Sequence, residues 1–384
     1  MMQYIRLGDI ASVAAGQGAP QGAENYTEYG TPFVKAGNLV ELISGTSEDA
    51  IQKVSEEVAV NHKLKLFPKG TVLFAKSGMS CMKGYVYTLS KDCYVVSHLA
   101  CITPHSVESD YLKYYFEFHR PNQLVKDASY PSISLSDIAE LPIAVFDQQK
   151  RQEIIRNLDT VSGLIEKKQQ LLALMDVAVK SRFIELFGDQ ETNPYNLAVG
   201  KLSDVADIYL GLTHTPTYVE QGRPFLSVRD ISSGMIDFSN CHYITEEEFC
   251  SLPNGARPKV GDMLFCRVGT IGKPVIIPEN TPEFGTFVSV GYLRKKANVN
   301  NYYLKSWMEN NYFMRQVYDN VAGASQINLN TGWLKNFRIL IPPIELQQQF
   351  AAFVEQTDKS KLAIQESLEK LETLKKALMQ KYFG

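Results

Sequence analysis

The segment QQKRQEIIRNLDTVSGLIEKKQQLLALMDVAVKSRFIELF, Gln148 to Phe187, contains no proline and carries apolar residues at helical spacing. The spacing runs in steps of three, four and seven, which is the period of an α-helix with one apolar stripe. The stripe consists of Ile154, Leu158, Val161, Ile165, Leu172, Met175, Val179 and Phe183. A helix of about 40 residues is roughly 60 Å long. One stripe on so long a helix needs a partner to cover it.

A second proline-free segment, Leu346 to Phe383, supplies that partner. Both segments end in Phe-Gly, at Phe187-Gly188 and at Phe383-Gly384. Two long helices with matching stripes predict an antiparallel coiled coil. They divide the chain into residues 1–147, a first spacer helix at 148–188, residues 189–345 and a second spacer helix at 346–384. The second stripe includes Phe350, Val354, Ile364, Leu368, Leu371 and Leu378.

The segments 1–147 and 189–345 repeat the same motifs in the same order. Leu-x-Asp opens each one, and a glycine follows at the same offset, Gly16 and Gly211. Residues 68–78 and 259–269 match best, each predicting a turn, a short buried strand, one basic residue and a glycine loop. An internal repeat of this size predicts two similar α+β domains related by a pseudo-twofold axis and separated by the paired helices.

Composition indicates a water-soluble protein of more than one domain. A chain of 384 residues is too long for one ordinary core. The N-terminus has no signal-peptide core, and no apolar run is long enough to span a membrane, so we expect a cytoplasmic location. The six cysteines show no C-x-x-C spacing and indicate reduced structural residues without a metal site.

Net charge does not favour broad nucleic-acid binding. The formal net charge is −3, and acidic residues outnumber basic ones in both 1–147 (16 against 12) and 189–345 (16 against 14). Any contact with DNA must therefore come from local patches or from basic partner proteins.

No catalytic motif is found along the chain. Asn193-Pro194-Tyr195 lacks the second proline of an adenine methyltransferase motif, and Gly16-Gln17-Gly18 is too short for a cofactor loop. The chain contains no phosphate-binding loop of the Walker type, and its histidines are scattered without metal-ligand spacing. We therefore expect no catalytic residue, no metal site and no cofactor in this chain.

The repeated motifs resemble the specificity subunit of type I DNA restriction–modification systems. The resemblance covers essentially the whole chain. It is carried by the two Leu-x-Asp openings, the two Leu-Phe-x-(Lys/Arg)-x-Gly segments, and Ile341-Pro342-Pro343 leading into Gln347-Gln348-Gln349. None of these motifs is specific alone, but their repetition in one order is.

The resemblance implies that each globular domain is a target recognition domain for one half of a split DNA site. It implies that the helices act as a ruler that sets the unspecified gap. The expected partners are double-stranded DNA, two methyltransferase subunits and motor-nuclease subunits. S-adenosylmethionine, ATP and Mg²⁺ are expected on those partner subunits.

Three loops in each half supply candidate DNA contacts. Lys76 and Arg267 follow the best-matched strand, where a basic side chain can bond guanine and the following glycine allows close approach. Lys83 and Lys273 lie further along the same loops and suit phosphate. A surface hairpin with an ordinary basic residue is the alternative. Ser77, Ser80 and Thr270 are weaker candidates, because loop hydroxyls often serve turns.

The other two loops carry amide, hydroxyl and charged groups. Lys35, Asn38, Ser227, Arg229 and Asp230 follow the Gly-x-Pro strand of each half, and Asn and Asp can read adenine and cytosine. Ser132, Gln326 and Asn328 lie in a third loop, for which a polar linker is the alternative. The aromatic helices near Tyr114 and Trp307 are assigned to core packing.

Two other functions stay open from the sequence. One is a stand-alone DNA methyltransferase or restriction enzyme, against which the missing motifs count. The other is a coiled-coil scaffold that binds only proteins. Sequence-selective DNA binding in the presence of a methyltransferase partner separates the favoured hypothesis from the scaffold.

Overall fold

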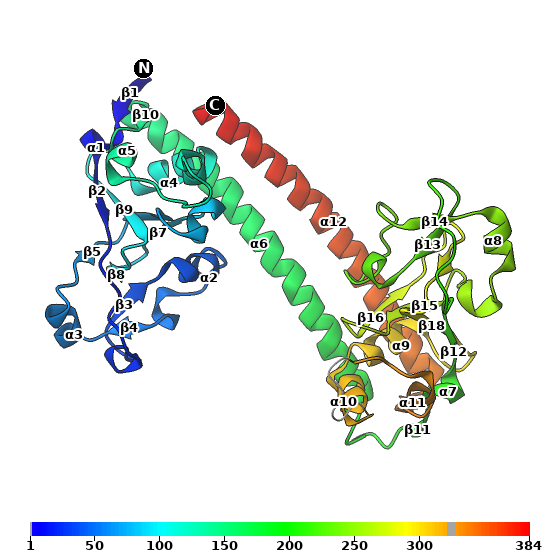
Figure 1. The fold of residues 1–384 in the computed structure, drawn as a ribbon. Helices are drawn as coiled ribbons and strands as arrows, with labels where there is room; N and C mark the ends of the chain where they lie inside the picture. The colour runs from blue at the N-terminus through cyan, green and yellow to red at the C-terminus, as the bar shows by residue number, and fades with distance from the viewer. Residues whose placement is uncertain (1, 321–326) are drawn as a thin grey trace. The chain divides into compact units, whose positions relative to one another are not determined.

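The computed structural model describes residues 2–320 and 327–384. The chain forms two compact units (Figure 1). Unit 1 contains Met1–Gln169 and Glu366–Gly384, and unit 2 contains Gln170–Gln365. Each long helix is therefore shared between the two units. Within the described residues, no helix is both long and apolar enough to cross a membrane.

Unit 1 is built from two four-stranded sheets and one two-stranded ribbon. The sheets have the orders β2-β9-β6-β7 and β4-β3-β8-β5, and the ribbon pairs β1 with β10. The strands are β1 Gln3–Arg6, β2 Ala11–Ala15, β3 Thr31–Val34, β4 Lys53–Val54, β5 Leu66–Phe67, β6 Val72–Ala75, β7 Val86–Thr88, β8 Cys93–Val95, β9 Leu99–Pro104 and β10 Pro142–Val145.

Short helices connect these strands and cover the sheets. Helix α4, Ser109–Phe118, buries Tyr111, Leu112, Tyr114, Tyr115 and Phe116, so its aromatic residues form core as predicted. The α-helices are α1 Leu7–Ile10, α2 Leu39–Ile43, α3 Glu56–Asn61, α4 Ser109–Phe118 and α5 Leu135–Ala139. The 3₁₀ turns are η1 Ala23–Asn25, η2 Ala36–Asn38, η3 Glu48–Ala50, η4 Met79–Lys83 and η5 Pro121–Leu124.

Unit 2 repeats the architecture of unit 1. Its sheets have the orders β12-β18-β15-β16 and β14-β13-β17, and β11 pairs with β19. The strands are β11 Ala198–Lys201, β12 Ala206–Leu210, β13 Arg223–Leu226, β14 His242–Ile244, β15 Met263–Cys266, β16 Gly272–Ile276, β17 Gly285–Thr286, β18 Val290–Lys295 and β19 Arg338–Ile341. The helices and 3₁₀ turns are α7 Leu202–Val205, η6 Val228–Asp230, α8 Glu246–Ser251, η7 Asn254–Ala256, α9 Asn301–Met308, α10 Asn311–Asn320 and α11 Thr331–Lys335.

The repeated glycines mark a close backbone contact in each unit. A Cβ atom added to Gly16 would lie 2.0 Å from the carbonyl oxygen of Val95, and one added to Gly211 would lie 2.3 Å from that of Thr286. The next amide in each case donates to the same strand, Gln17 to Val95 and Leu212 to Thr286. Glycine is required at both positions because no side chain fits between the two backbones.

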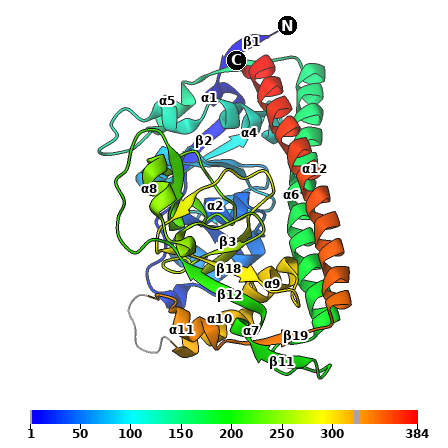
Figure 2. The same ribbon diagram turned by 90° about the vertical axis from the view of Figure 1, so that its right-hand side faces the viewer.

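The long helices are α6, Gln148–Phe187, and α12, Ile344–Phe383. The predicted bounds of α6 are confirmed, whereas α12 begins two residues before Leu346. In unit 1 the first half of α6 lies against the last turns of α12 (Figure 2). There the Asn157 side-chain amide donates to the Tyr382 hydroxyl at 2.9 Å. In unit 2 the end of α6 lies against the start of α12, and Lys361 donates to Asp176 at 2.6 Å. The helices are thus antiparallel.

The apolar stripes are most deeply buried at the helix ends. In unit 2, Phe183 and Phe187 of α6 pack on Phe350 of α12 and on Tyr303 of α9, with ring centroids 4.8–5.5 Å apart. Phe383 makes the equivalent contact in unit 1, with Tyr111 and Tyr115 of α4. The Phe-Gly endings of the two helices are therefore anchor points on the globular part of each unit.

Candidate nucleic-acid interface

In unit 1, the ends of several strands meet at one edge. Strands β3 and β8 are parallel, with Val34 opposite Val95, so the residues that follow them start from the same edge. The amide of Val96 donates to the Val34 carbonyl at 2.9 Å and holds the two strand ends together. Strand β6 ends at the same place, because its next residue, Lys76, donates its amide to the His98 carbonyl at 2.9 Å.

A fourth segment joins this edge through the loop after α4. The amide of Ile133 donates to the Lys76 carbonyl at 2.8 Å, and the amide of Gly78 donates to the Pro131 carbonyl at 3.0 Å. Ser77 and Ser132 face each other in this antiparallel bridge. Three predicted contacts, Lys76, Ser77 and Ser132, are thus brought together. We call this set, with His98, the unit 1 edge.

Unit 2 repeats the edge with other side chains. The Arg267 amide donates to the Ser289 carbonyl at 3.0 Å, and the Leu329 amide donates to the Arg267 carbonyl at 3.0 Å. Val268 and Asn328 form the bridge that corresponds to Ser77 and Ser132. The backbone is therefore conserved between the two repeats, whereas the side chains that it presents differ. Arg267, Val268, Ser289 and Asn328 form the unit 2 edge.

The two basic residues at matching positions behave differently. The Arg267 guanidinium is half-buried and donates to the carbonyls of Leu329 and Val288, at 3.0 and 2.8 Å, and to Oδ1 of Asn328 at 3.2 Å. Burial lowers the pKa of this guanidinium, which stays charged because its ordinary value is so high. Among the described residues, the Lys76 ammonium has no hydrogen-bond or ion-pair partner. Arg267 therefore stabilises the loops of the unit 2 edge, whereas the charge of Lys76 is available to a ligand.

The loops after β3 and β13 use their polar residues partly as turn caps. Oδ1 of Asn38 accepts the Lys35 amide at 2.8 Å, and its amide nitrogen donates to Glu41 at 2.6 Å. Asp230 is buried and accepts both the amide and the hydroxyl of Ser227, at 2.6 and 2.9 Å. Because these groups are already hydrogen-bonded, contact with a base edge would need them to exchange partners.

Two cations of these loops lie on aromatic or imidazole groups. The Lys35 ammonium lies 4.1 Å from the Tyr26 ring centroid and donates to Gln52 at 2.7 Å. Arg229 is exposed, and its guanidinium lies 3.1 Å from Nε2 of His242, which stacks on Tyr218 at 4.1 Å. The Arg229 group is the most accessible cation of its loop.

The remaining predicted contacts are less closely grouped. Lys83 is exposed at the end of η4, with its ammonium 5.9 Å from the Tyr85 ring centroid, and Ser80 lies half-buried in the same turn. Thr270 is exposed. Lys273 has a left-handed backbone (φ 50°) and lines a hollow of about 780 Å³ with residues of α6, α9, α10 and α12. Gln326 lies outside the described residues.

Sequence reasoning missed His98 and Ser289. Each lies at the turn that follows a short parallel strand, so neither belongs to a recognisable motif. A signal was nevertheless present: His98 follows Lys76 by 22 positions, and Ser289 follows Arg267 by the same 22. In a repeat protein, equal spacing from a matched residue identifies positions that share a place in the fold.

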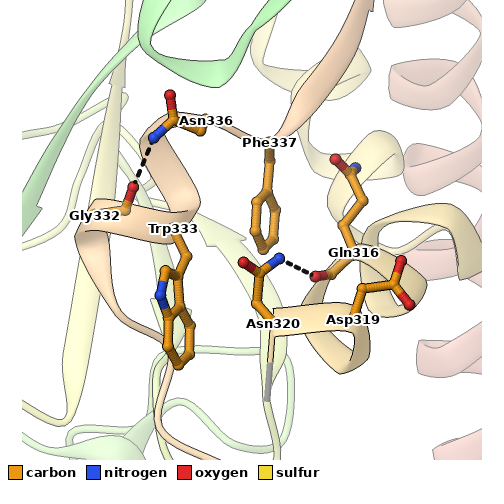
Figure 3. A pocket seen from close by; sticks show the side chains of 7 residues that line it. All are labelled: Gln316, Asp319, Asn320, Gly332, Trp333, Asn336 and Phe337. Atoms are coloured by element: carbon orange, nitrogen blue, oxygen red, sulfur yellow. Dashed lines mark hydrogen bonds between the residues drawn. The ribbon is translucent and has the colours of Figure 1, made fainter. Parts of the chain in front are cut away.

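A second hollow of unit 2, about 340 Å³, holds none of the predicted contacts (Figure 3). Its amides are hydrogen-bonded within the fold, since Asn336 donates to the Gly332 carbonyl at 3.0 Å, Asn320 to that of Gln316 at 2.8 Å, and Gln316 to that of Arg338 in β19 at 3.1 Å. The lining residues are Gln316, Asp319, Asn320, Gly332, Trp333, Asn336 and Phe337. The hydrogen bonds of Asn336 and Asn320 stabilise the ends of α11 and α10, so the hollow is a structural feature of this helix pair.

The repeat corresponds to a known family. The model of the type I restriction modification DNA specificity domain matches this chain twice, at residues 1–174 and 194–376. The chain belongs to this family. Each match covers one globular part and most of the long helix that follows it, so the specificity domain is the repeated module seen in the sequence.

Relatives of the specificity family share moderate identity with this chain. The specificity subunit of the type I restriction enzyme MjaIX from Methanocaldococcus jannaschii is 28% identical over 182 residues, which is 45% of this chain and 40% of that protein. The MjaX specificity subunit of the same organism is 28% identical over 200 residues, 50% of this chain and 46% of that protein. The matched part spans less than half the length of these relatives.

Solved structures of type I restriction–modification S subunits share the fold. The S subunit from M. genitalium has a TM-score of 0.61 at 14% identity, with 100% of this chain and 96% of that chain covered. A chain from a structure on complex assembly and conformational transition of the type I R-M system has a TM-score of 0.52 at 15% identity, with 100% and 97% covered. At these identities the likeness concerns the fold alone.

Proposed function

We propose that this chain is the DNA-specificity subunit of a type I restriction–modification complex, with each unit reading one half of a bipartite duplex site. The observation that carries the proposal is the repeated edge. One hydrogen-bonded backbone arrangement presents Lys76 and His98 in unit 1 but Arg267 and Ser289 in unit 2. Because the same backbone arrangement carries different side chains in the two units, each unit can recognise a different DNA sequence.

The edges supply the chemistry that duplex recognition needs. Accessible cations such as Lys76 and Arg229 suit phosphates, which position a protein on DNA. Hydroxyl and amide groups such as Ser132 and Asn328 suit base edges, which specify the sequence. The long helices would hold the two readers at a fixed spacing. A fixed spacing suits duplex DNA, because successive major-groove faces recur about every 34–36 Å.

We further propose that methylation and cleavage belong to partner subunits. The chain lacks the methyltransferase and nucleotide-binding motifs, so two methyltransferase subunits and the motor-nuclease subunits would supply S-adenosylmethionine, ATP and Mg²⁺. Binding of S-adenosylmethionine to the isolated chain, measured by calorimetry, is expected to be absent. Tight binding would favour a stand-alone methyltransferase instead.

The experiment that tests the proposal is to express the chain with the methyltransferase subunit of its own system and map methylated adenines. The expected result is one bipartite motif with two unequal halves and a constant gap. When the methyltransferase subunit is expressed without this chain, methylation of the motif should be lost completely. Methylation at a contiguous motif would contradict the two-reader model, and methylation that does not depend on the chain would favour a scaffold.

Lengthening both helices should lengthen the gap. Seven residues inserted between Gln169 and Gln170, and seven between Gln365 and Glu366, fall at the boundaries of the two units. A heptad adds about 10 Å to a helix and keeps its stripe in register, which corresponds to about three base pairs at 3.4 Å each. Methylation mapping should return the same two half-sites with a gap about three base pairs longer. An altered half-site sequence would contradict the ruler.

Replacing Lys76 with alanine should weaken DNA binding without relaxing specificity. The free ammonium suits a phosphate, and losing one phosphate contact reduces the slope of log K against log salt by about 0.9. Binding titrations at several salt concentrations, with the selected site and a scrambled duplex, measure this change. An equal slope of log K against log salt in the variant and the parent would show that Lys76 makes no phosphate contact.

A further inference from the structure

His98 is an exposed side chain on a rigid backbone. It lies in the turn between β8 and β9, where its carbonyl accepts the Lys76 amide at 2.9 Å. Its neighbours are held as well, since the Ser97 amide donates to the Gln17 carbonyl at 2.7 Å and the Leu99 amide to that of Val96 at 3.0 Å. The imidazole itself is exposed. The fold therefore fixes where this ring is presented but does not need the ring for packing.

One nitrogen of the ring is held by Ser77. Nδ1 of His98 lies 2.8 Å from the Ser77 hydroxyl, while Nε2 has no hydrogen-bond partner among the described residues. Ser77 has a fixed place too, because the backbone on both sides of it is bonded to residues 131–133. When the hydroxyl donates to Nδ1, the ring carries its proton on Nε2. When the neutral ring instead donates Nδ1–H to the hydroxyl, Nε2 is an acceptor.

The neighbours of His98 belong to the unit 1 edge. Lys76 is bonded to its backbone, Ser77 to its ring, and Ser132 lies opposite Ser77. The matching position in unit 2 is Ser289, whose hydroxyl accepts the Val228 amide at 3.2 Å and is thereby used within the fold. An oriented imidazole at this place is thus a feature of unit 1 and not of the repeat.

We propose that His98 is a DNA-contacting residue of the half-site read by unit 1, and that Ser77 is the positioning residue that orients its ring. With the Ser77 hydroxyl donating to Nδ1, Nε2–H would donate to an acceptor on the duplex. That acceptor is either a purine N7 or O6 in the major groove or a phosphate oxygen, and both take the same donor. This inference rests on the proposed DNA-reading function and adds a residue and its orientation to it.

The chain contains a matched control. His105 lies directly after the other end of β9, is exposed, and has Nδ1 2.9 Å from the hydroxyl of Ser106. The same chemical pair therefore occurs twice on one strand, once at the unit 1 edge and once away from it. His105→Ala reports what loss of an exposed imidazole does by itself.

The test uses the full chain, co-expressed with its methyltransferase subunit, and selection of bound duplexes from a random library. His98→Ala should weaken binding to the parental site about tenfold, the value of one good hydrogen bond of roughly 1.4 kcal/mol. A base contact predicts loss of preference at one position of one half-site. A phosphate contact predicts a uniform loss across sequences. His98→Gln, which retains a side-chain N–H, should recover part of the binding.

Ser77 is tested by a double-mutant cycle. Ser77→Ala should weaken binding in the parent but have little further effect in His98→Ala, because the hydroxyl acts only through the ring. Purely additive losses would overturn the positioning role. Unchanged binding by His98→Ala, or an equal loss in His105→Ala, would overturn the whole inference. A parent chain that selects no bipartite site would instead refute the proposed function.

Discussion

Arg267→Ala is expected to abolish sequence preference in the half-site read by unit 2 and to leave the other half-site intact. The guanidinium donates to two backbone carbonyls and to Asn328. Its removal deprives three acceptors of a charged donor and breaks the side-chain link between residues 328–329 and the Val288 carbonyl. Hydrogen bonds to charged groups contribute about 1.5–3 kcal/mol each. Because the guanidinium is only half-buried, water replaces part of these bonds, and we expect unit 2 to lose about 2–4 kcal/mol of local stability in addition to the loss of sequence preference.

Two measurements distinguish a loss of local stability in unit 2 from a loss of sequence preference. Hydrogen exchange reports the loosening of unit 2 directly, which is preferable because a chain of two units has no single unfolding free energy. Selection from a random duplex library reports the preference of each half-site. The matched control is Lys76→Ala, whose side chain has no partner among the described residues, so its stability change should stay within about 0.5 kcal/mol. Equal loss of preference in both half-sites after Arg267→Ala would contradict separate readers.

Phe350→Ala is expected to produce the largest loss of stability in unit 2. The ring is fully buried at the start of α12 and packs on Phe183 and Phe187 at 5.5 Å. Truncation of a buried phenylalanine to alanine costs about 3–5 kcal/mol, since it removes apolar burial and leaves a cavity. Because the Phe350 ring of α12 also contacts α6, its removal should loosen the packing of both helices against the rest of unit 2.

The neighbouring Phe353 is the control for this substitution. It lies one helical turn further along α12 and is 36% exposed. Phe353→Ala should cost less than about 1 kcal/mol, because most of the cavity term is absent. Calorimetry and hydrogen exchange on the two variants check the difference. Similar losses in both would mean that helix propensity, and not the aromatic cluster, secures the start of α12.

The helices and the repeat could be predicted from the sequence because they depend on periodicity. The bounds of α6 follow from the absence of proline and from one apolar stripe, and the paired Gly16 and Gly211 follow from equal offsets. These features are local, or are repeated in the chain itself. The loops that follow the repeated strands could be placed for the same reason, whereas the strand order and the shared edge could not be predicted.

The hydrogen-bond partners of the edge could not be predicted. Asn38 and Asp230 have suitable chemistry for bases, yet their oxygens accept amides of their own turns. Arg267 is bonded to segments 21 and 62 positions away along the chain, and such pairings follow from the tertiary fold. His98 was missed because a single histidine in a short turn belongs to no motif, and its equal spacing with Ser289 from the matched basic residues was not used. The allocation of half of each helix to each unit also depends on long-range packing.

That allocation has a consequence for biosynthesis. Unit 2 is one continuous stretch, Gln170–Gln365, whereas unit 1 incorporates Glu366–Gly384. Ribosomes add about 5–20 residues per second, so roughly 10–40 s separate synthesis of Gln169 from that of Glu366. During that interval Tyr111 and Tyr115 lack their partner Phe383. The portion translated first is therefore the last to complete its core, and it is the portion a nascent-chain chaperone would have most time to bind.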